Sequence, residues 1–318
     1  MFDVICIGNS SFDIFLSEFD SSNESFVETS DFDKIEVGSK IEFNKLNILP
    51  GGGAANSAIS FARHGLEVGV ISRIGQDAFG KRILNNFYKN GVDTKYIQVD
   101  KKIKSPTSVV ILNSTGEKTI FIFRGSEKSL SEKLIDFNKL QTKWLYVTSL
   151  AGNFQILESI FSHANNNEIK IFFNPGYREI INSSIMKYLN HSDVVQLNLN
   201  EAKKLFDTTD LKVVLHKAKS IVKNVFLIND GENGTYLIKK DKVIKSNIIT
   251  AKVKDLTGAG DAFGSGYLTG ILKTEDEVSA LKYGAYSAAQ VVQKTGSQTN
   301  IVNKYPKNIN LKIEEIKI

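Results

Sequence analysis

Short apolar runs alternate with amphipathic stretches along most of the chain. Runs rich in Val, Ile, Leu and Phe occur at 4–7, 144–148, 170–173, 194–197 and 225–228. Such runs predict buried strands, and the stretches between them have the spacing of amphipathic helices. Strands that are buried on both faces and separated by helices are typical of a parallel sheet covered by helices. The pattern therefore predicts an α/β fold.

Two further regions show a half-exposed β pattern. Residues 35–48 alternate loosely between apolar and polar positions, and β-rich runs at 108–112 and 118–123 surround a turn at 113–116. The two runs around the turn predict a hairpin. Together with residues 35–48 they predict a small sheet that lies over the ligand-binding site. The acidic, serine-rich stretch 17–34 is expected to be an exposed connection.

The stretch from Asp255 to Phe263 reads DLTGAGDAF. An apolar-alternating segment ending near Val253 precedes it and small, apolar residues follow, which predicts a strand, a glycine turn and a helix. The bare backbone of the turn and the partial positive charge of a helix N-terminus form an anion site. A carboxylate inside that site, Asp261, suits a phosphoryl transferase, which needs a base beside donors that hold developing charge. Asp261 as a helix cap or dipole partner is the alternative.

Polar and glycine positions elsewhere are also candidates for ligand contact. Asp13 follows the first predicted strand, and ligands of open α/β sheets bind beyond the carboxyl ends of strands. Gly51 and Gly52 precede an apolar helix that ends near Gly65, and Asn56 falls in its first turn. A turn residue at Asp13 and a flexible turn at the glycines remain the structural alternatives.

A near-match to a phosphate-binding P-loop occurs at 75–82. Arg82 replaces the Ser or Thr that would bind Mg²⁺, and Asp77 would repel phosphate. We therefore expect a helix start in which Asp77 is the N-cap.

Composition narrows the class of protein. The 318 residues carry a net charge of +5 without a Lys/Arg block long enough to suggest a nucleic-acid arm, so the charge indicates little about partners. We expect no nucleic-acid partner. The single cysteine, Cys6, fits a reducing compartment, and the N-terminal run lacks a basic leader. No apolar stretch approaches membrane-spanning length. We expect a cytoplasmic protein with no membrane contact and, since no repeat or composition break appears, a single domain over 1–318.

The motifs in order resemble those of the ribokinase-like (PfkB) family of sugar and nucleoside kinases, although Leu256 stands where that family usually has Thr. The resemblance implies a three-layer α/β sandwich, with a mostly parallel central sheet flanked by helices and a small β lid from about 15–49 and 103–125. It implies that Asp261 is the catalytic base and that the amides of Gly258, Ala259 and Gly260 form the anion hole. Substrate contacts are implied for Asp13, Gly51, Gly52 and Asn56.

The same resemblance implies ATP and Mg²⁺ as cofactors. The residues expected near the nucleotide are Asn198, Glu201, Gly231, Gly234, Thr257, Gly258 and Gly260. Glu201 would organise Mg²⁺ through water, while Asn198 and Glu201 as a simple helix cap, and 231–234 as a type I′ turn, are the alternatives. Asp255 would adjoin a monovalent cation such as K⁺.

The expected reaction is transfer of the γ-phosphoryl group of ATP to a hydroxyl of a sugar of ribose, fructose or sugar-acid type. A nucleoside kinase is the alternative, with Phe12, Phe43 and Phe123 as an aromatic wall; a catalytically silent regulator on the same fold is a third interpretation. Arg124, at the end of the hairpin, is either surface charge or a contact for an anionic substrate group. Family lids often pair subunits, so a homodimer through the lid is expected.

Overall fold

The computed structural model describes residues 1–19, 38, 40–112, 118–125 and 130–318. The described residues form a nine-stranded sheet, a four-stranded sheet and a two-stranded pair, β5 (Arg73–Gly75) with β6 (Gln98–Asp100). In the large sheet the strands lie in the order β15 (Ile313–Ile316), β14 (Val243–Ser246), β13 (Thr235–Ile238), β12 (Val225–Asn229), β11 (Val194–Asn198), β10 (Lys170–Phe173), β9 (Thr142–Val147), β1 (Phe2–Ile7) and β4 (Val68–Ile71).

The large sheet is parallel from β4 through β12 and antiparallel from β12 to β15. All five buried strands predicted from apolar runs are present in its parallel part. The antiparallel strands β13, β14 and β15 were not predicted. Every parallel strand ends at the same edge of the sheet, so the loops that follow these strands are brought together.

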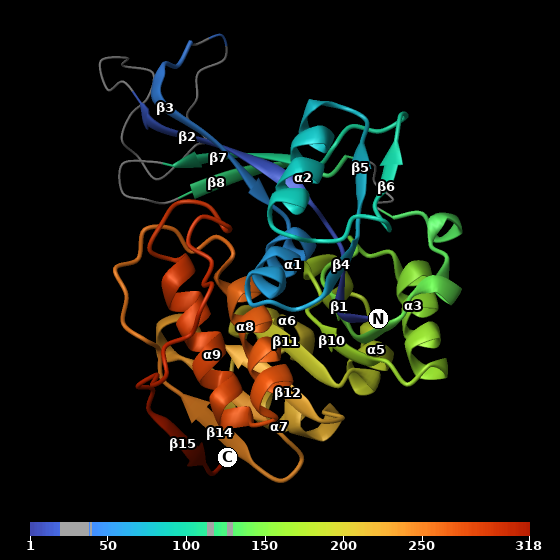
Figure 1. Cartoon of the computed structure of the whole chain (residues 1–318). Coiled ribbons are helices and arrows are strands. Elements are labelled where there is room, and N and C mark those ends of the chain that lie inside the picture. The colour runs from blue at the N-terminus through green and yellow to red at the C-terminus, as the bar shows by residue number, and fades with distance from the viewer. Residues whose placement is uncertain (20–37, 39, 113–117, 126–129) are drawn as a thin grey trace.

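Helices cover both faces of the large sheet (Figure 1). One apolar core packs α3 (Phe154–Asn166), α4 (Tyr177–Ile180), α5 (Ile185–His191), α6 (Leu199–Phe206) and α7 (Leu211–Ile221) on one face. A second core packs α1 (Gly53–Arg63), α2 (Ala78–Lys89), α8 (Ala259–Thr274) and α9 (Glu277–Val291) on the other. The result is a three-layer α/β sandwich, as expected. None of the helices in the described part of the chain has the length and apolar character to span a membrane.

The four-stranded sheet lies apart from the sandwich, above α1 and α8 (Figure 1). Its strands lie in the order β3 (Phe43–Gly51), β2 (Ser11–Phe19), β7 (Thr107–Leu112) and β8 (Lys118–Phe123). The predicted hairpin is β7 with β8, and its turn at 113–116 lies outside the described residues. Most of the expected connection at 17–34 and the start of the 35–48 segment also lie outside them.

One predicted strand is wrong. The segment ending near Val253 is not a strand, since residues 247–254 carry no strand and β14 ends at Ser246. Its apolar side chains line a pocket instead of a sheet face, and this gives the same alternation in the sequence. Two of its backbone N–H groups, at Lys254 and Asp255, donate to the Val292 carbonyl after α9.

Candidate active site

The glycine turn before α8 is tightly built. Gly258 is the N-cap residue and has a left-handed backbone with φ of 81°. A Cβ placed there would lie 2.4 Å from Cβ of Ser297, so only glycine fits. The N–H of Ala259 donates to the Leu256 carbonyl at 3.2 Å, whereas the described backbone hydrogen bonds leave the N–H groups of Gly258 and Gly260 without a protein partner. Two of the three expected anion donors are therefore available.

Asp261 lies in the first turn of α8 and accepts a hydrogen bond from Asn56 Nδ2 at 2.7 Å. Burial raises the pKa of the Asp261 carboxyl from 3.8 to about 6, although the Asn56 bond acts in the opposite direction. The partial positive charge of the helix N-terminus favours the ionised form. Desolvation outweighs the stabilising contacts, yet a pKa of about 6 still leaves a carboxylate that is mainly ionised at pH 7.

Most of the hydrogen-bonding capacity of Asn56 is used within the protein. Its Oδ1 accepts hydrogen bonds from Ser297 Oγ at 2.9 Å and from Gln298 Nε2 at 2.8 Å. The acceptor is thereby saturated, and one N–H of the amide remains after the bond to Asp261. Ser297 and Gln298 are contacts that the sequence did not indicate, because they lie in the loop after α9, about 240 residues from Asn56.

Asp13 lies within β2 and not in a turn. It accepts a hydrogen bond from Ser108 Oγ of β7 at 2.5 Å. A Cβ on Gly51 would lie 2.2 Å from Asp13 Oδ2, so the glycine permits the close approach of β3. Gly52 follows as the N-cap residue of α1, the helix that carries Asn56. The structure thus joins Asp13, Gly51, Gly52 and Asn56 along the junction between the small sheet and α1.

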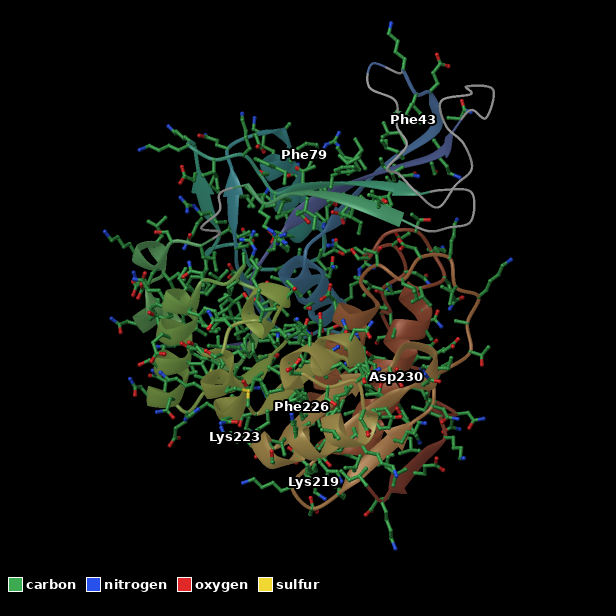
Figure 2. All side chains as sticks on the ribbon, turned by 180° about the vertical axis from the view of Figure 1, so that it is seen from behind. Phe43, Phe79, Lys219, Lys223, Phe226 and Asp230 are labelled. Carbon is green, nitrogen blue, oxygen red and sulfur yellow. The ribbon has the colours of Figure 1, made fainter. Side chains whose placement is uncertain are left out.

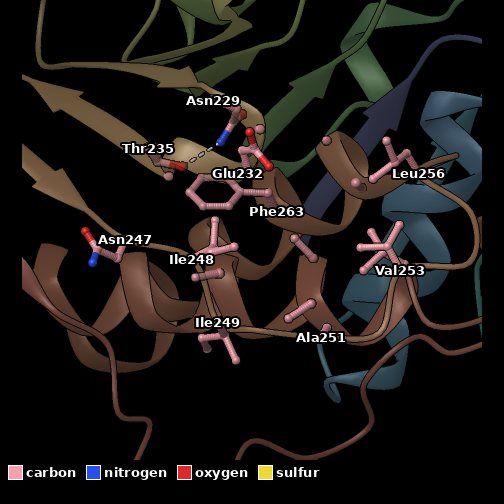
Figure 3. A pocket seen from close by; sticks show the side chains of 18 residues that line it. Asn229, Glu232, Thr235, Asn247, Ile248, Ile249, Ala251, Val253, Leu256 and Phe263 are labelled. Carbon is pink, nitrogen blue, oxygen red and sulfur yellow. Dashed lines mark hydrogen bonds between the residues drawn. The ribbon is translucent and has the colours of Figure 1, made fainter.

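An apolar pocket of about 480 Å³ adjoins the glycine turn (Figure 3). Ala259 and Gly260 form part of its wall, so the pocket and the turn share backbone. The other lining residues are mainly apolar and include Ile248, Ile249, Val253, Leu256, Phe263, Ala285, Ala288 and Val292. Such a lining suits a flat, largely apolar group such as a nucleobase.

The predicted glycine loop lies at the rim of this pocket. Gly231, Glu232 and Asn233 form a 3₁₀ turn between β12 and β13, rather than the alternative type I′ turn. Gly231 and Gly234 both line the pocket. The sequence placed this loop correctly, because a glycine pair directly after a buried strand must lie at the carboxyl edge of the sheet.

Asn198 and Glu201 form a capping box at the start of α6. Asn198 Oδ1 accepts from the Glu201 N–H at 2.8 Å, and Glu201 Oε2 accepts from the Asn198 N–H at 2.9 Å. The helix-cap alternative is therefore present in the structure. Asn198 pairs with Asn229, a pocket residue, across β11 and β12. Burial raises the pKa of the Glu201 carboxyl.

Gln196 links the glycine turn to the pocket and was not singled out from the sequence. Its Nε2 donates to the Gly260 carbonyl at 2.9 Å and to Asn229 Oδ1 at 2.8 Å. Asn229 Nδ2 in turn donates to Thr235 Oγ1 at 2.9 Å, as Figure 3 shows. A buried glutamine in a central strand was the available signal, since buried amides need defined partners.

Asp255 connects the turn to the loop after α9. Its Oδ1 accepts from the N–H of Thr257 at 2.9 Å and from Thr257 Oγ1 at 2.6 Å, and its Oδ2 accepts from the Gly296 N–H at 2.9 Å. No cluster of three or more His, Cys, Asp or Glu side chains that could enclose a metal occurs among the described residues.

The remaining candidates lie apart from this centre. Arg124 is exposed directly after β8, and within the described contacts nothing joins it to Asp13 or Asn56. Phe12 is buried against Phe79, with ring centroids 5.9 Å apart, so it is not free to cover a ligand. Phe43 is exposed near the outer end of the small sheet (Figure 2).

Asp77 is the N-cap of α2, as predicted. Its carboxylate accepts from the Gly80 N–H at 2.8 Å and from the N–H and Oγ of Ser105. The near-match to a P-loop is therefore a capped helix start.

Comparisons with known proteins agree with this geometry. The family described as "pfkB family carbohydrate kinase" matches residues 15–304. A ribokinase from Haemophilus influenzae is 27% identical over 280 residues, which cover 83% of this chain and 88% of that protein. A 5-dehydro-2-deoxygluconokinase from Mesomycoplasma hyopneumoniae is 26% identical over 311 residues, 91% of each chain.

A solved ribokinase from Arabidopsis thaliana, complexed with ribose and ATP, superposes with a TM-score of 0.79. It is 20% identical, and the match covers 94% of this chain and 95% of that one. At this identity the likeness shows a shared fold.

Proposed function

The chain belongs to the pfkB family of carbohydrate kinases, and we propose that Asp261 is the base with which it transfers the γ-phosphoryl group of ATP to a sugar hydroxyl. The observation that carries the proposal is the position of Asp261. Its partly buried carboxylate lies at a helix N-terminus, held by Asn56 on one side and adjoining the pocket wall at Gly260 on the other. The base thus lies between a polar group of side chains and an apolar pocket, as phosphoryl transfer between two substrates requires.

The residues take separate roles. Asp261 accepts the proton of the attacking hydroxyl, and its pKa of about 6 suits a base that works near neutral pH. The N–H groups of Gly258 and Gly260 face the transferring phosphoryl group and hold its charge, while Ala259 keeps the turn closed through Leu256. Thr257 completes the nucleotide-binding turn through its bonds to Asp255.

The apolar pocket is proposed to hold the adenine of ATP. Gly231 and Gly234 form one rim, and the side chains of 248–253 form the opposite wall. Its volume of about 480 Å³ and its apolar lining fit a nucleoside, with the phosphates directed to the turn it shares at Ala259 and Gly260.

Glu201 is the proposed protein contact of Mg²⁺, through water, with Asn198 fixing its orientation. One carboxylate with waters and substrate phosphates is usual for this ion, so the lack of a carboxylate cluster among the described residues fits it. When bound, Mg²⁺ would neutralise phosphate charge. Asp255, which bonds both the turn at Thr257 and the loop after α9 at Gly296, is proposed to adjoin a monovalent cation. Kinetics in K⁺ compared with a bulky organic cation test this.

A sugar is favoured over a nucleoside as acceptor. Asp13, Ser108 and Asn56 offer polar partners for hydroxyl groups. The aromatic wall that a nucleobase needs is not assembled, because Phe12 is buried against Phe79 and Phe123 pairs with Thr107, one position out of step with the Ser108 that bonds Asp13. Neighbouring residues of a strand point to opposite faces, so Phe123 lies on the far face.

Arg124 is proposed to meet an anionic group of the substrate when the small sheet closes. The similarity to a kinase named for a dehydrogenated deoxygluconate, a sugar acid, motivates the proposal. If the best substrate is neutral, or if Arg124→Ala leaves the KM for a charged one unchanged, Arg124 has no such role.

The small sheet is proposed to act as a lid on a single kinase domain and to pair two subunits. Its strand β8 exposes Phe121, Ile122 and Phe123 to solvent, so the sheet gains from a partner that covers them. We place the enzyme in the cytoplasm within this proposal, because ATP is available there and Cys6 is a free thiol.

A coupled assay of ADP release over pentoses, hexoses, sugar acids, phosphosugars and nucleosides tests the function. We expect one sugar or sugar acid to be turned over with kcat/KM well above the others, with the Asp261→Asn variant as the negative control. A clear preference for a nucleoside, or turnover that the Asn variant retains, would contradict the proposal.

A further inference from the structure

A continuous row of hydrogen-bonded amides leads away from Asp261 to the far end of α1. Asn56 Nδ2 donates to Asp261 Oδ2 at 2.7 Å, and Gln298 Nε2 donates to Asn56 Oδ1 at 2.8 Å. Asn86 Nδ2 of α2 donates to Gln298 Oε1 at 2.8 Å. Side chains from α1, α2 and the loop after α9 therefore form one line of bonds.

The row continues to a positive charge. Asn90 Nδ2 donates to Asn86 Oδ1 at 3.3 Å and to the Asn86 carbonyl at 2.8 Å. Arg63 Nε donates to Asn90 Oδ1 at 3.0 Å. We call the row the amide relay; its members are Arg63, Asn90, Asn86, Gln298 and Asn56.

The two ends of the relay fix the direction of every amide in it. A guanidinium can only donate, and an ionised carboxylate can only accept. Each amide between them must therefore receive a hydrogen bond on its oxygen and give one from its nitrogen. All the dipoles consequently point the same way, and bonds in such a chain polarise and strengthen one another.

Arg63 occupies an unusual place for a cation. It is half-buried, desolvation lowers its pKa, and no carboxylate lies within ion-pair distance of it in the described part of the chain. Its second contact is a bond of 3.5 Å from Nη1 to the Ile301 carbonyl. The last turn of a helix favours a cation, but that alone does not require a row of four amides ending at the candidate base.

We propose that the amide relay is a positioning device in which Arg63 stabilises the ionised form of Asp261 and fixes the orientation of its carboxylate. This rests on the proposed role of Asp261 as base. The relay would offset part of the desolvation that raises the pKa of Asp261. Since Gln298 follows Ser297, which packs on Gly258, the same loop would also align the base with the glycine turn.

The other groups around Asp261 supply no competing positive charge. Cys6 of β1 and Tyr146 of β9 interact with Asp261, and burial raises the pKa of both, so they are neutral near pH 7. On α1, Ser60 Oγ accepts from Ser265 Oγ of α8 and is neutral. At the far end of α8, Lys273 Nζ bonds the His64 carbonyl, and burial lowers the pKa of His64 to about 4.

Two variants that each remove one positive charge test the proposal. Arg63→Met breaks the relay, whereas Arg82→Met removes an exposed charge from α2, the helix that carries Asn86 and Asn90. The expected result for Arg63→Met is a shift of the acid limb of the kcat profile to higher pH by about half a unit, with an unchanged KM for ATP. Gln298→Leu should shift it in the same direction, Arg63→Lys should restore part of the wild-type profile, and Arg82→Met should follow the wild type.

A double-mutant cycle in the free energy of unfolding tests the proposal without a measurement of enzyme activity. The stabilising effect of Asp261→Asn at pH 7 is measured by denaturation in the wild-type, Arg63→Met and Arg82→Met backgrounds. If the relay stabilises the charge, the effect is larger in the Arg63→Met background than in the other two.

Equal effects in all three backgrounds, together with an unshifted acid limb, would overturn the relay and leave Arg63 as a partner of the α1 terminus. Failure of the base assignment itself looks different: Asp261→Asn would then retain turnover whatever the residue at 63.

Discussion

At the residue scale, the central finding is that one carboxylate is both partly buried and held by a hydrogen bond. Asp261 has a pKa raised to about 6 by desolvation, opposed by the bond from Asn56. A base must be deprotonated to accept a proton, so activity is expected above this pKa and is lost as the pH falls through it.

The first prediction is that activity falls at low pH, where Asp261 becomes protonated. Between about pH 7.5 and 5, kcat at saturating substrates should fall, approaching tenfold per pH unit below about 6. Steady-state kinetics measure this, with circular dichroism at each pH to show that the protein remains folded. A level kcat down to about pH 5 in the folded enzyme would contradict a base with this pKa.

The second prediction concerns stability. The folded-state pKa of Asp261 is above the unfolded value of 3.8, so its contribution to stability is present below pH 3.8 and is lost as the pH rises through about 6. Asp261→Asn removes the buried charge and should raise the free energy of unfolding by roughly 2 kcal/mol at pH 7, with the gain shrinking toward pH 4. Urea denaturation at several pH values checks it, and a variant less stable than the wild type at pH 7 would count against it.

At the element scale, the α8 N-terminus depends on the backbone of Gly258. The φ of 81° and the contact with Ser297 exclude a side chain for two separate reasons. Gly65, after α1, has a similar φ of 78°, but a Cβ added there would meet nothing within 4 Å. Substitution of Gly65 therefore introduces backbone strain alone, whereas substitution of Gly258 introduces the strain and also disrupts the packing of the turn.

We expect Gly65→Ala to lower stability by about 1 kcal/mol without changing kcat. Gly258→Ala should lower stability by more than this, because the clash with Ser297 adds to the backbone strain. It should also lower kcat by at least about tenfold, because the Gly258 and Gly260 amides move. Denaturation and steady-state kinetics measured on both variants make the comparison. Equal kcat in the two variants would show that the turn does not support catalysis.

The sequence predicted those elements that depend on interactions between residues close together in the chain. The buried strands, the capped α2 and the glycine turn before α8 were predictable, because each depends on neighbours within a few residues. The segment before Asp255 was predicted as a strand, since apolar side chains facing a pocket alternate as they would in a sheet. The contacts of Gln298 with Asn56 and of Gln196 with Gly260 could not be predicted. The sequence around an amide side chain does not indicate which distant residue it bonds.

At the scale of the whole molecule, the small sheet has two different faces. Asp13, Ser108 and Ile122 share one face, since Ser108 pairs with both other residues and bonds Asp13. Phe121 and Phe123 lie on the other face, where they are 56% and 51% exposed. Ile122 is 58% exposed. Apolar groups are thus open to solvent on both faces, which a lid that also pairs subunits would cover.

The fourth prediction distinguishes closure of the small sheet over the substrate from pairing of two subunits through it. Ile122→Ser should raise the KM for the sugar, whereas Phe121→Ser with Phe123→Ser should weaken self-association and leave that KM nearly unchanged. Light scattering after size exclusion, together with kinetics, gives both readouts. A monomeric wild type would remove the pairing role, and an unchanged KM in Ile122→Ser would remove the closure role.

Binding and turnover measured together in Asp261→Asn decide whether this carboxylate is the base. The variant keeps the shape of the side chain but cannot accept the proton. Calorimetry should show ATP affinity that is equal to or tighter than that of the wild type, because a negative charge beside the phosphates is gone, while kcat should fall by about 10²–10⁴-fold. Near-normal turnover in this variant would contradict the assignment of Asp261 as the base.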